Sequence, residues 1–179
     1  MAESFSNALT RAAGIVTTSS AGSIGITTNL ITGISTGVVS VGDLIDNTNF
    51  IAGTKVATIG AGQVTADRNS TNTSATSSQT VRFLGVTTAY TSPAATKSIL
   101  IGGTFANNTG NQVNLTLEVY DSSSGISAAI ASKIPVPAGS SFVISDTGKT
   151  LLESNDALRI YCDTANAIDA NLSILTGVA

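Results

Sequence analysis

The sequence predicts an all-β protein built from tandem antiparallel β modules, with a short N-terminal arm or helix in front. Short β-branched runs punctuated by Gly, Asn, Asp and Ser begin at Ile15 and continue to the end of the chain. Charged residues make up only 11% of the 179 residues and hydrophobic residues 42%, with a net charge of -3. A disordered chain has the opposite balance, so this chain is expected to fold.

Residues 1–14 are predicted to be an N-terminal arm, and residues 2–13 within it form the one helical candidate. Phe5, Ala8, Leu9 and Ala12 fall at positions i, i+3, i+4 and i+7, and Gly14 is a plausible end. Three turns are too few for a helix to be stable alone. We therefore expect an arm that is either frayed or ordered against a neighbour.

Residues 15–85 are predicted to form an N-terminal β module. Its expected strands are Gly14–Thr18, Ser23–Thr28, Leu30–Ser35, Val38–Ile45, Lys55–Ile59, Gly62–Ala66 and Gln79–Leu84. The run from Asn69 to Ser78 is almost entirely Ser, Thr and Asn, which is typical of a loop.

Residues 86–96 are predicted to be a linker, because Pro93 and its small neighbours interrupt the strand pattern. Residues 97–179 are predicted to form a C-terminal β-sandwich of the jelly-roll or immunoglobulin-like kind. Its expected strands are Lys97–Phe105, Gln112–Tyr120, Ile126–Ile134, Gly139–Ser145, Asp156–Asp163 and Asp169–Thr176. Pro135 and Pro137 cannot lie inside a central strand.

The composition argues against catalysis and against a bound metal or cofactor. The absence of His excludes Ser-His-Asp and Cys-His pairs and His-containing metal sites, and the lone Cys162 is expected to be a small buried residue. The acids Asp43, Asp46, Asp146, Glu153 and Asp156 lie in or beside turns, where such side chains bond their own backbone. A hydrolase that uses carboxylates alone is the remaining enzymatic alternative.

Four side chains are candidates for contacts with a partner. Phe5 and Leu9 lie on the apolar stripe of the N-terminal arm, and Tyr120 and Tyr161 fall on the outward parity of their predicted strands. Because the chain has no basic cluster and no run of 18 apolar residues, we expect neither a nucleic-acid partner nor a membrane span. The first residues lack the pattern of a secretory signal, so synthesis in a cytoplasm is expected.

Two parts of the chain resemble modules of virion structural proteins from tailed phages, particularly those of marine cyanobacteria and other marine bacteria. The first runs from LITGISTGVVSVGDLIDNTNF at Leu30 to TVRF at Phe83. The second comprises KSILIGGTFANNTGNQVNLTLEVYDSS, KIPVPAGSSFVI and LLESNDALRIYCDTANAIDANLSIL, and is similar to a β-sandwich domain of phage head, neck and tail proteins. The resemblance covers roughly residues 30–178 and carries no catalytic signature.

The resemblance implies a non-enzymatic virion protein, and a capsid decoration (cement) protein is the leading hypothesis. Such a protein would bind the major capsid protein on the particle exterior and stabilise the head. A homotrimer suits this role, because shared contacts supply burial that small β modules lack. The alternatives are a neck, tail, baseplate or fibre-attachment protein, and a bacterial adhesin-like surface module.

Overall fold

The computed structural model describes residues 3–145 and 149–178, and throughout these ranges the regular structure is β, with no helix. The predicted all-β class is therefore confirmed. Residues 15–86 form one compact unit, and the residues before and after them form a second unit together. The two modules are thus not arranged in tandem, because the first unit is inserted into the second.

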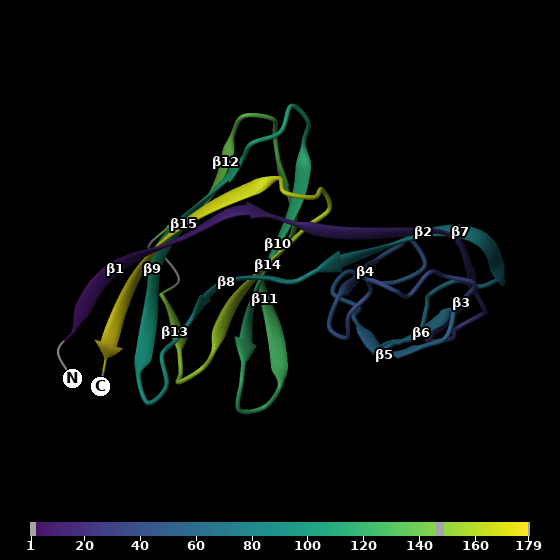
Figure 1. Cartoon of the computed structure of the whole chain (residues 1–179), viewed down its shortest axis with the longest axis horizontal. Coiled ribbons are helices and arrows are strands. Elements are labelled where there is room, and N and C mark those ends of the chain that lie inside the picture. Colours follow the sequence, from purple (N-terminus) through teal and green to yellow (C-terminus); the bar gives the residue numbers. More distant parts are fainter. Residues whose placement is uncertain (1–2, 146–148, 179) are drawn as a thin grey trace. The chain divides into compact units, whose positions relative to one another are not determined.

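The N-terminal segment is a strand, β1 (Ser4–Ala13), so the expected helix and the frayed alternative are wrong, and the arm is ordered against another strand of the same chain. β1 pairs antiparallel with the last strand, β15 (Ile168–Val178), from Ser4 opposite Thr176 to Ala13 opposite Ile168. Figure 1 shows the two strands running side by side. A three-turn helix would leave most of its apolar stripe without a partner, whereas the strand obtains backbone hydrogen bonds along the edge of a ready-made sheet.

The unit that holds both ends of the chain is a two-layer antiparallel sandwich. Sheet I has the order β1-β15-β9-β12, with β13 also paired to β9, and sheet II has the order β11-β10-β14-β8. The remaining bounds are β8 (Thr87–Thr91), β9 (Lys97–Asn107), β10 (Val113–Asp121), β11 (Ile126–Val136), β12 (Ser141–Ile144), β13 (Thr150–Leu152) and β14 (Ala157–Cys162). The predicted linker 86–96 thus contains β8, an edge strand of sheet II. Pro135 lies in the other edge strand, β11, where a missing N–H is tolerated.

The sandwich core lies between the inward faces of the two sheets. Sheet I contributes Leu100, Phe105 and Leu172, and sheet II contributes Leu117 and Ile160, all buried in one cluster. Leu117 and Ile160 have the parity opposite to Tyr120 and Tyr161 on the same two strands, so the outward parity predicted for the tyrosines matches the observed core. Cys162 belongs to the same cluster, as expected for a small buried residue.

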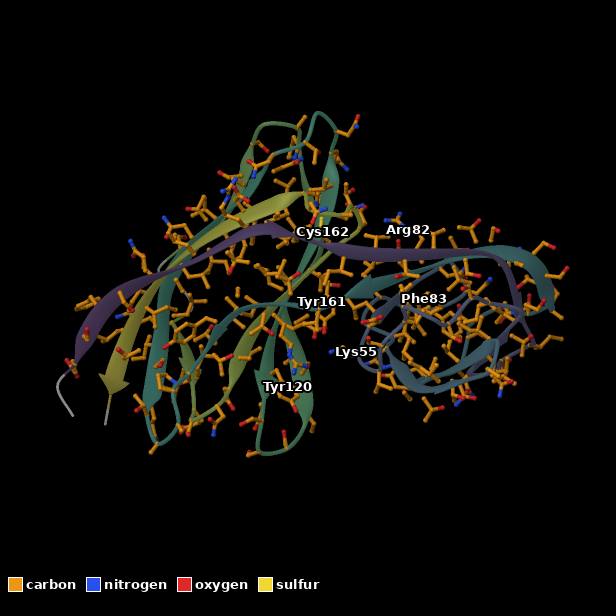
Figure 2. The ribbon with its side chains drawn as sticks, viewed as in Figure 1. Lys55, Arg82, Phe83, Tyr120, Tyr161 and Cys162 are labelled. Atoms are coloured by element: carbon orange, nitrogen blue, oxygen red, sulfur yellow. The ribbon has the colours of Figure 1, made fainter. Side chains whose placement is uncertain are left out.

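The inserted unit is a small barrel. Its strands are β2 (Ile15–Ile24), β3 (Leu30–Thr32), β4 (Leu44–Asp46), β5 (Val56–Gly60), β6 (Gln63–Ala66) and β7 (Thr76–Gly85), in the order β4-β7-β2-β3-β6-β5. A bridge between Leu44 and Lys55 joins the two ends of this sheet, with Ile45 N–H donating to the Thr54 carbonyl at 2.8 Å. The core includes Phe83, labelled in Figure 2. Closure leaves the sheet without a long free edge.

The strand expected over Val38–Ile45 is largely wrong, because only Leu44 and Ile45 belong to a strand there. Gly42 has a positive φ of 92° and Val38 and Val41 are exposed, so the stretch before β4 is a series of turns. The alternation of Val with Ser and Gly resembled a half-buried strand. The two short strands expected between Gly14 and Thr28 are instead one continuous strand, β2.

Gly14 lies where the chain leaves the sandwich. Its φ is 120°, its N–H donates to Thr87 Oγ1 at 3.4 Å, and its carbonyl accepts from Asn166 N–H at 2.9 Å. A Cβ at this position would collide with the Thr164 carbonyl oxygen. Alanine would therefore bring both a steric clash and a backbone conformation that side chains disfavour.

We predict that Gly14→Ala lowers the free energy of unfolding of the sandwich by about 2 kcal/mol or more. All three tyrosines lie in the sandwich and the chain has no Trp, so tyrosine fluorescence in urea reports on this unit alone. Gly110→Ala is the matched control, because its Cβ would meet nothing within 4 Å. Equal losses in the two variants would contradict the role assigned to Gly14.

Candidate partner-binding surface

β1 presents two large apolar side chains to solvent. Phe5 is 75% exposed and Leu9 is 73% exposed, and their spacing of four places both on the outer face of sheet I. Ala8, on the opposite face of the strand, packs against the sandwich core. The two arm residues predicted to contact a partner are thus held together on an ordered strand.

The outer face of sheet I continues this apolar surface across three further strands. Phe5 lies opposite Leu175 of β15, Leu175 lies opposite Ile99 of β9, and Ile99 lies opposite Leu151 of β13. Directly opposed residues share one face of a sheet, so these four side chains form an apolar row. Phe5 and Leu151 are exposed at its two ends, and Ile99 and Leu175 are half-buried. Contiguous exposed apolar side chains of this kind mark interaction sites.

A carboxylate of the neighbouring strand is bound at the second half of β1. The Asp169 carboxylate accepts a hydrogen bond of 2.8 Å from the Ala12 N–H, at the bulge that separates Thr10 from Ala13 in the pairing with β15. This hydrogen bond, together with the Asn108 side chain and the charge of Arg11, holds the pKa of Asp169 below its usual value. Asp169 therefore stabilises the bulge near the end of β1.

The two candidate tyrosines lie on the face of sheet II that is turned away from the core, on opposite sides of one charged pair. On this face Glu118 of β10 is directly opposite Arg159 of β14, with Tyr120 and Tyr161 next to them along the two strands. The Arg159 guanidinium stacks on the Tyr120 ring, with 3.5 Å between its carbon and the ring centroid. Figure 2 labels both tyrosines.

Tyr161 does not have the exposure expected for a contact residue. Only 1% of its surface is accessible, and burial, followed by the neighbouring charge of Glu118, raises the pKa of its hydroxyl. Strand parity correctly placed it on the face away from the sandwich core, but parity does not say whether that face is covered. Tyr120 is half-buried, and its ring is stacked against Arg159. The exposed apolar surface of the sandwich therefore lies mainly on sheet I, which includes β1.

Of the acids considered for catalysis, Asp43 and Asp156 accept hydrogen bonds in turns. Asp46 ends β4 and pairs with Arg82 at 3.5 Å, and Glu153 pairs with Lys97 at 3.3 Å. Asp43 accepts from Ser40 N–H at 2.8 Å, and Asp156 accepts from the N–H groups of Ser122 and Glu153, each at 3.0 Å. Asp146 lies outside the described residues. Within residues 3–145 and 149–178, no group of three His, Cys, Asp or Glu side chains is placed to hold a metal ion. No helix in these ranges has the length and apolar character needed to cross a membrane.

A shallow groove of about 500 Å³ lies on the barrel. Its lining combines Ile24 and Leu30 with small and hydroxyl-bearing residues and includes no charged side chain. Such a groove offers neither a nucleophile with a base nor a cluster of ligands.

Sequence reasoning missed the neighbours of Phe5. Ile99, Leu151 and Leu175 belong to separate segments, and only their register in sheet I brings them into line. A weak signal was present only in NLSILTG, where Leu175 shares its parity with the polar Asn171 and Ser173, which marks it as outward-facing. Comparison with protein-family models, curated proteins and solved structures returns no match for this chain.

We predict that Tyr120→Leu destabilises the sandwich by about 0.5–1 kcal/mol, because leucine keeps the apolar bulk but removes the ring under Arg159. Tyr120→Phe keeps the ring and is expected to stay within about 0.3 kcal/mol of the parent. Urea unfolding followed by the remaining two tyrosines measures both variants. If Tyr120→Phe lost as much stability as Tyr120→Leu, the hydroxyl and not the cation–π contact would be the stabilising group.

The lowered pKa of Asp169 predicts that the stability of the sandwich depends on pH. Because its pKa is lowered in the folded state, its contribution to stability is present above about pH 4 and is lost as the pH falls through the folded pKa. Asp169→Asn retains an acceptor for Ala12 N–H but cannot titrate. Thermal unfolding between pH 5 and 2 should therefore fall more steeply for the parent than for Asp169→Asn. Parallel curves would contradict this assignment.

Proposed function

We propose that this chain is a non-enzymatic structural protein of a phage virion, a capsid decoration protein that binds the major capsid protein lattice on the particle exterior. In this role it stabilises the head by adding buried contact area between capsomers, and it catalyses no reaction. It is made in the host cytoplasm and joins the particle during assembly. The proposed partners are the capsid lattice and further copies of the chain.

The observation that carries this proposal is the outer face of sheet I. An exposed apolar row that spans four strands is costly to leave in water, and burial against another protein recovers that cost. Near β1 the row is flanked by hydroxyls and amides, as at Asn7, Ser173 and Asn171, and the charges beside its other end, Lys97 and Glu153, pair with each other at 3.3 Å. Depletion of charge is typical of the centre of an interface.

The resemblance to virion modules supports the same proposal. Its second part runs through β9 to β15, so it covers both sheets of the sandwich. Its first part covers β3 to most of β7 in the barrel. Both units are compact β structures, and their conspicuous acids are used in turns and strand ends, which suits a part that must last and assemble rather than react.

Copy number in purified particles tests the assignment. Quantitative mass spectrometry should find this chain in a fixed ratio to the major capsid protein, either close to one or a simple fraction of it, and cryo-electron microscopy should place it over the shell. A handful of copies at one vertex or along the tail would contradict a decoration role and favour the neck, tail or fibre alternative. Absence from particles would overturn the virion assignment itself.

Binding to particles that lack the chain tests the surface. We expect Leu151→Ser, which interrupts the apolar row, to lower the occupancy on such particles several-fold, because the contact loses apolar area. Ile126→Ser is the matched control, since Ile126 is 65% exposed but belongs to β11 at the edge of sheet II. Equal loss in both variants would show that the apolar row is not the contact.

A further inference from the structure

β1 is an edge strand whose second edge has no partner strand in the described part of the chain. On the side of β8 it is tied only near its end, where Thr10 Oγ1 donates to the Ala89 carbonyl at 3.4 Å and Gly14 N–H reaches Thr87. Natural edge strands are usually protected by Pro, charge or a bulge. Between Ser4 and Thr10 the strand has neither a Pro nor a charged residue, and its bulge follows Thr10. An edge of this kind is a template for another strand.

The sequence of β1 is complementary to itself in one antiparallel register. When two copies pair about Asn7, Phe5 of each copy lies opposite Leu9 of the other, and Glu3, just before β1, comes near Arg11, at the start of the bulge that follows Thr10. The two apolar side chains and the two opposite charges on the exposed face are thus all matched. Both kinds of cross-strand pair stabilise a sheet.

Other registers lose this match. Centring the pair on Ser6 places Glu3 opposite Leu9, and centring it on Ala8 places Phe5 opposite Arg11. A shift by a single position sets the exposed face of one copy against the core-facing side of the other, because side chains alternate along a strand. The register about Asn7 is therefore strongly preferred.

We propose that β1 pairs antiparallel with β1 of a second copy of this chain, centred on Asn7, so that sheet I continues across a two-fold axis. This pairing adds a partner to the proposed function. It rests on that proposal only in that β1 is treated as a surface for assembly. In this pair the free edge of each β1 is occupied by the other β1, so the contact does not extend to further copies. It therefore favours pairs over the trimer expected from the sequence.

The first test is the mass of the purified full chain in solution. Sedimentation equilibrium over a concentration series should show a species of twice the 17.9 kDa chain mass. A single-chain mass at every concentration, or a trimer without a dimer, would overturn the proposal. If the chain stays monomeric and β1 variants lose binding to particles, another virion protein covers β1. Self-pairing would then be wrong, although the proposed function would stand.

Charge exchange tests the register. Glu3→Arg and Arg11→Glu each place like charges opposite one another and should raise the dimer dissociation constant by at least about tenfold at low salt. The double variant Glu3→Arg with Arg11→Glu restores the opposite pairing and should dimerise like the parent. In the double variant a negative charge at position 11 still lies near Asp169, so any damage that Arg11→Glu does to the fold remains. Recovery of the dimer therefore reports the restored charge pairing and not a repaired fold. Failure of the double variant to recover would overturn the register.

A cysteine placed on the proposed axis gives an independent readout. Asn7 faces Asn7 of the other copy, at the Cα separation of a directly opposed pair, which a disulfide can span. Asn7→Cys should therefore cross-link into dimers with glutathione disulfide as oxidant. Ser173→Cys is the control, because it is exposed on the same face but one strand away from the axis, and the native Cys162 is buried. Equal cross-linking of both variants would reject the pairing.

Discussion

The antiparallel pairing of β1 with β15 joins the two ends of the chain, and the arrangement of the rest depends on it. It covers what would otherwise be the open edge of β15, and it brings Ala8 and Ala13 against a core to which both sheets of the sandwich contribute. It also fixes where the chain leaves the sandwich. Gly14 at that exit is hydrogen-bonded to Thr87, the residue at which the chain returns. The barrel is therefore an insertion whose entry and exit strands, β2 and β7, pair from the first residue of β2 and the last residue of β7, with Ile15 opposite Gly85.

The two units deal with sheet edges in different ways. The barrel closes through the bridge between Leu44 and Lys55, so its backbone hydrogen bonds are largely satisfied within one small sheet. The sandwich remains open at β1, where backbone groups and large apolar side chains are exposed together. The free edge and the apolar row of sheet I share Phe5, so a partner that bound there would gain both hydrogen bonds and apolar burial.

The scarcity of charge is reflected in how polar side chains are used. Asn107 donates to the carbonyls of Asn111, Val136 and Pro137 and accepts from Thr109, which pins the loop between β9 and β10 to the end of β11. Asp121, in the turn after β10, accepts hydrogen bonds from Ser123 and Ser124, which lower its pKa to about 2. Hydroxyls, amides and Asp121 thus stabilise turns locally, and β1 carries no charged residue between Ser4 and Thr10, as the proposed assembly role requires.

Alternation along the chain was sufficient to predict the all-β class, the strands β10 and β14 and their core-facing residues, because period two is a local property of a half-buried strand. It did not reveal that Phe5 to Leu9 form a strand, since spacings of three and four residues suit a helix equally well until a partner strand is present. It also could not tell that Tyr161 is covered or that Leu151, Ile99 and Leu175 lie in line with Phe5. Those features depend on register between segments far apart in sequence, and only the tertiary structure, in which β1 meets β15 and β13 meets β9, decides that register.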